Sequence, residues 1–189
     1  MTKIRVCIVD DEKLFMQGMR MILEMDPEIE VVMTASSGKD FFNQLENHDS
    51  HIDVILMDLE MPEMDGVEFL HDHALPNLEL HPVDEDVILH PNCSLRKLGL
   101  DGKMLSIAKQ CARSASVPLN LGCCAFAGDR GLLYPELTAS ATEKETAEVN
   151  ARDYDGYYSS NITCEIGMSE ATGKDYVSIV YLKKKASAV

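Results

Sequence analysis

The chain has 189 residues, enough for one large domain or two small ones with a real hydrophobic core. Apolar residues make up 46% and charged residues 26%, a composition typical of globular and not of disordered chains. The formal net charge of −15 argues against nucleic acid or an anionic membrane surface as a direct partner. Every apolar run is shorter than the roughly 18 residues that a membrane span needs. The N-terminus turns acidic at once, unlike a secretory signal, so we expect a cytoplasmic protein.

Charge and cysteine are unevenly distributed along the chain. Residues 1–70 carry a net charge of −11, whereas residues 71–189 carry −4. Five of the six cysteines lie in the second part, and only Cys7 lies in the first. Because the chain shows no export signal, we expect these thiols to be reduced and to serve metal binding, redox chemistry or packing. The shift in composition predicts a domain boundary near residue 70.

The first part alternates strand and helix patterns. Residues 4–9 form a run that is apolar except at Arg5, typical of a strand buried on both faces of a parallel sheet. Residues 12–25 have apolar side chains at helical spacing, and Pro27 ends that pattern. A second strand is expected at 29–34, a short helix from Ser37-Gly38 to Leu45, and a third buried strand at 54–57. This order predicts a doubly wound parallel sheet of the flavodoxin-like, receiver type.

The second part continues the alternation. Strands are expected at 87–90, 117–121, 157–158 and 177–182. A helical stripe includes Leu100, Met104, Ile107 and Cys111, and a further helix is expected from Pro135 to about residue 151. The whole chain is therefore predicted to be α/β, with helices on both faces of a parallel sheet.

Three carboxylates follow strands of the first part. Asp10 and Asp11 come directly after the first strand, and Asp58 follows the third. The carboxyl ends of parallel strands meet at one edge of a sheet, where ligands bind. Clustered carboxylates repel one another, and an oxygen-only set with open water positions suits Mg²⁺. A carboxylate held there can also act as a nucleophile toward a phosphoryl group. The alternative interpretation is that these residues are solvated turn formers.

The first part resembles the receiver domain of bacterial two-component response regulators. The resemblance rests on IRVCIVDDE, on IEVVMTASSG and on the D-x-x-M-P-x-M-D-G block that begins at Asp58. It implies that Asp58 is the phosphoacceptor, and that Asp10, Asp11 and Asp58 hold Mg²⁺ together with the backbone carbonyl of Glu60. It also implies that Pro62 and Gly66 shape the loop after Asp58. The implied partner is a sensor histidine kinase or a small phosphodonor.

The receiver resemblance stops near Leu70, before the fourth and fifth strands of that family. The fifth strand of the family ends in a lysine that pairs with the phosphoryl group. The C-terminal VYLKKKAS is similar to that strand end and would place this lysine at Lys184. The alternative interpretation of residues 183–189 is a solvated lysine-rich tail.

Four cysteines of the second part lie at strand–turn positions. They are Cys93, Cys123, Cys124 and Cys164. Thiolates that converge from such positions suit a soft metal or an iron–sulfur cluster. Alternatively they are small buried core residues, which is the favoured interpretation for Cys7 and Cys111. His90 follows a predicted strand and could ligate a metal, although a structural role is commoner for such a histidine.

Residues 71–182 resemble the cysteine-rich CCG region at the C-terminus of FAD-linked D-lactate or 2-hydroxyacid dehydrogenases. The resemblance rests on VILHPNCSLRKLGLDGKM, LGCCAFAGDRGLLYPELTASAT and YDGYYSSNITCEIGM. It implies that the four cysteines mark an iron–sulfur or redox site. Ala125 stands in place of the glycine of CCG, and Gly167 stands in place of the last cysteine of a C-x-x-C pair. The sequence contains neither the flavin domain of that family nor a site for FAD.

Two partial domains thus meet at residues 70–71 without a linker. Natural fusions usually join whole domains, so we hypothesise a chimera in which one sheet continues from residues 1–70 into residues 71–182. A phosphoacceptor module at Asp58 is the favoured function. The alternatives are a redox or iron–sulfur module of the CCG type and an inactive α/β scaffold. We expect no complete catalytic domain, and at most phosphorylation and dephosphorylation of the receiver part.

Overall fold

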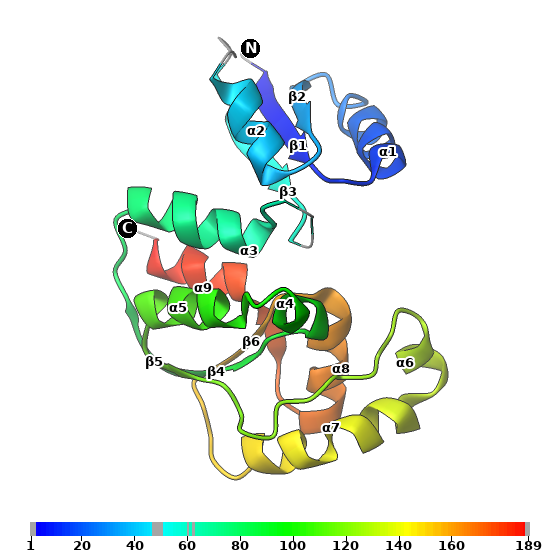
Figure 1. The fold of residues 1–189 in the computed structure, drawn as a ribbon, viewed down its shortest axis with the longest axis vertical. Helices are drawn as coiled ribbons and strands as arrows, with labels where there is room; N and C mark the ends of the chain where they lie inside the picture. The colour runs from blue at the N-terminus through cyan, green and yellow to red at the C-terminus, as the bar shows by residue number, and fades with distance from the viewer. Residues whose placement is uncertain (1–2, 47–50, 60, 62, 188–189) are drawn as a thin grey trace. The chain divides into compact units, whose positions relative to one another are not determined.

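The computed structural model describes residues 3–46, 51–59, 61 and 63–187 (Figure 1). The chain divides into two compact units, Met1–Phe69 and Leu70–Val189. Helical residues run from Gly66 to Asn77, so the division falls within a helical stretch of the chain. No described helix is both long and apolar enough to cross a membrane.

The first unit is a small parallel sheet with helices on both faces. Its strands pair in the order β2-β1-β3, and all the pairings are parallel. Its elements are β1 (Ile4–Val9), α1 (Lys13–Leu23), β2 (Ile29–Ala35), α2 (Gly38–Leu45), β3 (Val54–Met57) and α3 (Gly66–Phe69). The side chain of Ser37 caps α2 by accepting a hydrogen bond from the backbone N–H of Asp40 at 3.1 Å. The five strands and helices expected up to residue 57 are confirmed.

The central strand β1 carries the core of the first unit. Its side chains alternate, so Cys7 and Val9 pack on one face with Phe41 of α2. Val6 and Ile8 pack on the other face, against methionines of α1. A strand covered on both faces is what its largely apolar sequence predicts. The α/β class with helices on both faces is therefore confirmed.

The third strand is less buried than the sequence suggested. Val54 is 42% exposed and Ile55 is 38% exposed. The reason is that β3 is the last strand of its sheet in the described chain and pairs only with β1. The prediction of a strand at residues 54–57 is correct, but the prediction that this strand is buried is wrong.

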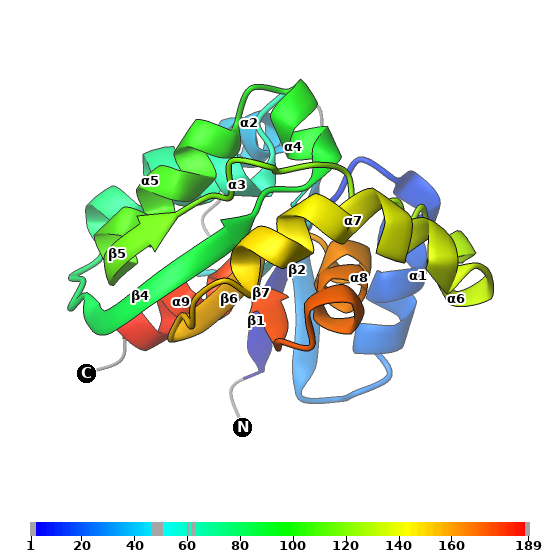
Figure 2. The same ribbon diagram turned by 90° about the horizontal axis from the view of Figure 1, so that it is seen from below.

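The second unit holds a separate four-stranded parallel sheet of order β5-β4-β6-β7. Figure 2 shows β4 between β5 and β6. Figure 1 shows α5 and α9 on one face of the sheet and α7 and α8 on the other. The strands are β4 (Val83–His90), β5 (Ala112–Ser116), β6 (Gly156–Ser159) and β7 (Tyr176–Ser178). The helices include α4 (Cys93–Lys97), α5 (Asp101–Cys111), α6 (Arg130–Leu133), α7 (Pro135–Val149), α8 (Ile162–Thr172) and α9 (Ile179–Ala186).

Three expectations about the sheets are wrong. The described strands form two sheets, so one sheet does not continue through the chain. The strand expected at 117–121 is displaced to Ala112–Ser116, where it pairs with β4 in parallel register. The strand expected at 177–182 ends at Ser178, whose side chain accepts a hydrogen bond from the N–H of Val180 and begins helix α9. Lys184 is therefore a helical residue of the second unit and does not end a strand.

Candidate functional site

Two groups of potential metal ligands come together among the described residues. In the first unit, carboxylate oxygens of Asp10, Asp11 and Asp58 lie within 4.8 Å of one another. In the second unit, a ring nitrogen of His90 and the sulfurs of Cys124 and Cys164 do the same. We call these groups the acidic group and the thiol group. The acidic group lies at strand ends, whereas the thiol group combines a strand end, a loop and a helix start.

The acidic group is positioned by the ends of β1 and β3. The backbone N–H of Asp58 donates to the carbonyl of Val9 at 2.9 Å, which ties the end of β3 to the end of β1. Asp10 in turn donates its N–H to the carbonyl of Ala35 at the end of β2. The carboxylate of Asp10 accepts a hydrogen bond from the N–H of Glu12 at 2.8 Å, which fixes its orientation. The strand-end placement expected from the sequence is thus present in the structure.

The acidic group concentrates negative charge at a partly buried position. Asp10 is 7% exposed. Burial raises the pKa of its carboxyl, and the charges of Asp58 and Asp11 raise it further, against the N–H of Glu12. Ionised carboxylates in such a cluster are destabilised unless a cation offsets their charge. The oxygen-only donor set is the kind that Mg²⁺ prefers.

Gly66 lies tightly against the backbone of Asp58 and Leu59. A Cβ atom at this position would lie only 2.6 Å from the carbonyl oxygen of Asp58, so a larger residue does not fit. This close approach agrees with the loop-shaping role implied for Gly66. Glu60 and Pro62, for which we also expected roles, lie outside the described residues.

A pocket of about 260 Å³ opens beside the acidic group. Its walls come from the ends of β1 and β3 and from α1, and they are mainly apolar. The lining residues are Ile8, Val9, Asp10, Phe15, Met19, Leu56, Met57 and Asp58. Two of the three carboxylates therefore border a cavity that a small ligand can enter.

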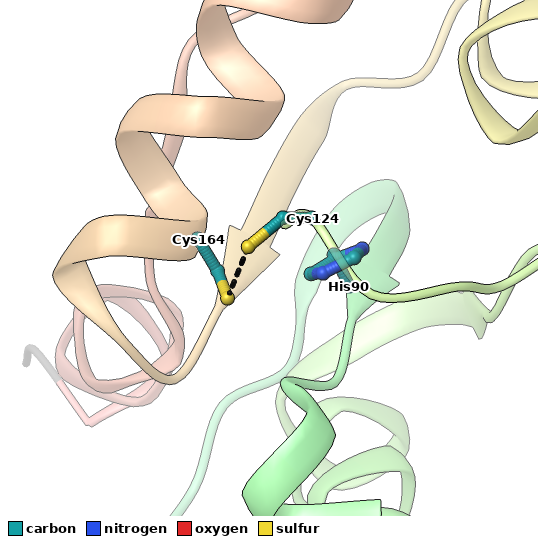
Figure 3. Close-up of side chains that lie close together, drawn as sticks. All are labelled: His90, Cys124 and Cys164. Atoms are coloured by element: carbon teal, nitrogen blue, oxygen red, sulfur yellow. Dashed lines mark hydrogen bonds between the residues drawn. The ribbon is translucent and has the colours of Figure 1, made fainter. Parts of the chain in front are cut away.

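The thiol group is assembled at the carboxyl end of β4 (Figure 3). His90 ends that strand, Cys124 lies in the loop before α6, and Cys164 lies in the first turn of α8. The sulfurs of Cys124 and Cys164 point toward each other and are 3.0 Å apart. His90 is fully buried, and the two cysteines are 4% and 5% exposed.

A buried carboxylate orients His90. Nδ1 of His90 and Oε1 of Glu145, from helix α7, are 2.7 Å apart, and Glu145 is only 1% exposed. The other carboxylate oxygen accepts a hydrogen bond from the N–H of Gly122 at 3.1 Å, close to the cysteine loop. Because Nδ1 is occupied, Nε2 is the nitrogen left to interact with the thiols. Glu145 therefore links the histidine and the cysteine loop.

The thiol group favours one thiolate and one thiol. A hydrogen bond from Cys164 is the largest cause that brings the pKa of Cys124 down to about 4, and His90 acts in the same direction against burial. Cys124 and burial raise the pKa of Cys164. Burial alone would lower the pKa of His90, but Cys124 and Glu145 raise it to about 9. The directions of these shifts favour a protonated His90 beside an ionised Cys124, with Cys164 as the protonated thiol.

The remaining cysteines divide into two kinds. Cys93 is half-buried and Cys123 is exposed, and both lie outside the thiol group. Cys7 and Cys111 are fully buried core residues, as expected. The four-cysteine set implied by the CCG resemblance is therefore only partly brought together, and His90 joins it.

The structure shows the surroundings of Ala125 and Gly167, the two positions where the sequence departs from the CCG pattern. Ala125 adopts a φ of +53°, a left-handed conformation that glycine takes without cost. A Cβ atom at Gly167 would lie 3.0 Å from the ring of Phe126, so this ring would have to shift to admit the thiol that a C-x-x-C pair would supply.

Sequence reasoning missed Glu145. A signal was present, because helix α7 buries Thr138, Thr142, Glu145 and Val149 on one stripe at helical spacing. An acidic residue on a stripe that packs against a core requires a buried partner. Only the fold shows that His90, 55 residues earlier in the chain, is that partner.

A comparison with known protein families finds a match that covers most of the first unit and the first residues of the second. Residues 6–76 match the response regulator receiver domain. We call these residues the receiver segment. The match includes residues 6–9 of β1, the whole of β2 and β3, and all three members of the acidic group.

Curated relatives match part of this chain over part of their own length. A protein-glutamate methylesterase/protein-glutamine glutaminase of Hydrogenovibrio crunogenus is 46% identical over 89 residues, covering 45% of this chain and 23% of that protein. The transcriptional regulatory protein DegU of Brevibacillus brevis is 36% identical over 110 residues, covering 54% of this chain and 44% of that protein. The chain thus spans less than half the length of either relative.

Among solved structures, the CheX-CheY-BeF3-Mg complex from Borrelia burgdorferi is 18% identical to this chain. The alignment covers 74% of this chain and 90% of that chain, with a TM-score of 0.37.

Proposed function

We propose that the receiver segment is a phosphoacceptor signalling module in which Asp58 is phosphorylated in a Mg²⁺-dependent reaction. The observation that carries this proposal is the convergence of the Asp10, Asp11 and Asp58 carboxylates within 4.8 Å at the ends of two neighbouring strands. The match of residues 6–76 to the receiver domain supports it.

The donor set of the acidic group fits Mg²⁺. Asp10, Asp11 and Asp58 each offer a carboxylate oxygen, and the backbone carbonyl of Glu60 is the further ligand that the receiver resemblance implies. When bound, Mg²⁺ would offset the charge of these carboxylates and of a phosphoryl group.

The reaction is a phosphoryl transfer to a carboxylate. A carboxylate oxygen of Asp58 attacks phosphorus, and the bond from phosphorus to the donor breaks on the opposite side. Asp10 is oriented by its hydrogen bond from Glu12, so it holds its position while Asp58 reacts. The donor is a phosphohistidine of a sensor kinase or a small acyl phosphate, since both carry a reactive phosphoryl group.

Beryllofluoride tests whether Asp58 accepts a phosphoryl-like group. In fluorine NMR spectra of the whole chain with beryllofluoride and Mg²⁺, we expect bound signals that disappear when Mg²⁺ is removed. Asp58→Asn should abolish them, because a neutral amide oxygen does not replace the carboxylate ligand. Asp53→Asn, an exposed carboxylate at the start of β3, is the control and should keep them. Equal signals in the Asp58→Asn variant would contradict the proposal.

The second candidate function is a redox module in the second unit. The convergence of Cys124, Cys164 and His90 favours it, since these residues lie far apart in sequence. A four-thiolate iron–sulfur cluster fits the residues poorly, because Cys93 and Cys123 lie outside the group and Gly167 supplies no thiol. The CCG resemblance, the chimeric origin and the inactive scaffold stay predictions.

A further inference from the structure

The thiol group has a geometry that suits chemistry between its two sulfurs. Cys124 and Cys164 are 3.0 Å apart, sulfur to sulfur. Two thiolates on one tetrahedral zinc ion, with bonds of about 2.3 Å, would lie about 3.8 Å apart. The observed separation is shorter than that, and a disulfide would require the sulfurs to approach by about 1 Å more.

The surroundings of Cys124 stabilise a negative sulfur. The imidazole of His90 lies within 4.8 Å of the two sulfurs and is held by Glu145. The left-handed backbone at Ala125 turns the chain directly after Cys124. Cys164 and His90 lower the pKa of Cys124, whereas Cys124 and burial raise the pKa of Cys164.

Burial decides which oxidant can reach the pair. The two cysteines are 4% and 5% exposed, so a bulky disulfide or a protein thiol cannot reach their sulfurs without opening the fold. Hydrogen peroxide is little larger than water, and a thiolate next to a second thiol is the arrangement that reacts with it reversibly.

We propose that Cys124 and Cys164 form a hydroperoxide-reactive dithiol, in which Cys124 is the attacking residue and Cys164 the resolving residue. His90 supplies the proton to the leaving group, and Glu145 is a positioning residue that acts through His90. This proposal specifies the reaction of the second candidate function, the redox module, and is independent of the phosphoacceptor site.

The reaction has two steps, an oxidation of Cys124 by the hydroperoxide and a disulfide formation with Cys164. The Cys124 thiolate attacks the terminal oxygen of a hydroperoxide, the O–O bond breaks, and the leaving alkoxide or hydroxide takes the proton from His90. This oxidises Cys124 to a sulfenic acid and reduces the hydroperoxide to an alcohol or, for hydrogen peroxide, to water. The Cys164 sulfur then attacks the Cys124 sulfur, the S–O bond breaks, and water leaves with the proton of Cys164. The product is a Cys124–Cys164 disulfide.

The direct test is to treat the reduced whole chain with hydrogen peroxide and map the thiols by alkylation and peptide mass spectrometry. We expect two of the six thiols to be lost first, in a disulfide that joins the peptides of Cys124 and Cys164. A first disulfide between any other pair, or equal reaction of all the cysteines, would overturn the proposal. This test needs no variant, so it does not depend on the folding of one.

Variants assign the two roles. Cys164→Ser should leave a sulfenic acid on Cys124 that a dimedone probe traps. Cys124→Ser should slow the first oxidation by about tenfold or more, since an ordinary thiol is only a few per cent ionised at pH 7. Cys111→Ser is the matched control, because it removes a fully buried thiol of the same unit outside the group. An unchanged rate in Cys124→Ser would contradict the assignment.

The positioning role and the metal alternative have separate readouts. Glu145→Gln should make the peroxide reaction rate rise with pH across the neutral range, whereas the unaltered protein should show a flat profile there.

Zinc or iron that is bound stoichiometrically in the isolated protein and protects both sulfurs from peroxide would overturn the dithiol proposal. An iron–sulfur spectrum would do so too, while supporting the redox alternative in its cluster form.

Discussion

Glu145→Leu is expected to lower the free energy of unfolding of the second unit by about 3–5 kcal/mol. The substitution leaves the buried His90 without the carboxylate that lies 2.7 Å from its Nδ1, and it removes the acceptor of the Gly122 N–H. Leucine has a similar volume, so the main effect is electrostatic and comes from an uncompensated buried charge. Urea unfolding followed by circular dichroism measures this change.

Two variants on helix α7 separate the effect of charge from that of helix propensity. Glu143→Leu changes an exposed residue two positions earlier and should alter the unfolding free energy by less than about 0.5 kcal/mol. Glu145→Gln keeps an oxygen acceptor for the histidine and should give an intermediate loss. A Glu145→Leu protein as stable as the unaltered chain would show that this ion pair does not support the fold.

Asp10→Asn is expected to abolish the stabilisation of the first unit by Mg²⁺. At a Mg²⁺ concentration ten times its dissociation constant, binding should raise the unfolding free energy of the unaltered protein by about 1.4 kcal/mol. The variant lacks one of the three carboxylates, so this increase should disappear. Thermal unfolding with and without Mg²⁺, at fixed ionic strength, provides the measurement.

Without Mg²⁺ the same substitution should have the opposite effect and raise stability. The pKa of Asp10 is higher in the folded chain than its ordinary value of 3.8, so the ionised carboxylate favours the unfolded chain and stability from this group falls as the pH rises past that value. Asparagine removes this effect and keeps an acceptor for the N–H of Glu12.

Asp26→Asn is a matched control for the Mg²⁺ effect, because exposed Asp26 accepts from the N–H two residues later at 2.9 Å, as Asp10 does at 2.8 Å. If Asp26→Asn removed the Mg²⁺ effect equally, the acidic group would not be the binding site.

The first unit was predictable because its local patterns are strong. Residues 4–9 and 29–35 are rich in β-branched residues, and the Ser37 cap marks the start of α2 in the sequence. Strand ends then fix where Asp10 and Asp58 lie. The exposure of Val54 was not predictable, because it depends on which strands pair with β3. The sequence of a strand does not specify which strands lie next to it.

The elements of the second unit were harder to predict, because strand pairing in the folded chain overrides the local preference for helix or strand. The sequence of β5, ARSAS, has few good strand formers, yet it pairs with β4, while the apolar 117–121 segment forms no strand. In the same way Ser178 converts an apparent strand into the start of α9. The thiol group was partly predicted, since Cys124 and Cys164 were candidates. The partnership of His90 and Glu145 depends on a contact over 55 residues that sequence spacing does not reveal.

The most direct test of the phosphoacceptor account is to incubate the whole chain with acetyl phosphate and Mg²⁺ and to map the phosphorylated residue by borohydride reduction and peptide mass spectrometry. The account predicts one phosphoryl group, on Asp58, that is absent without Mg²⁺ and absent from Asp58→Asn. Phosphorylation at another carboxylate, or none under conditions where Mg²⁺ stabilises the first unit, would contradict it.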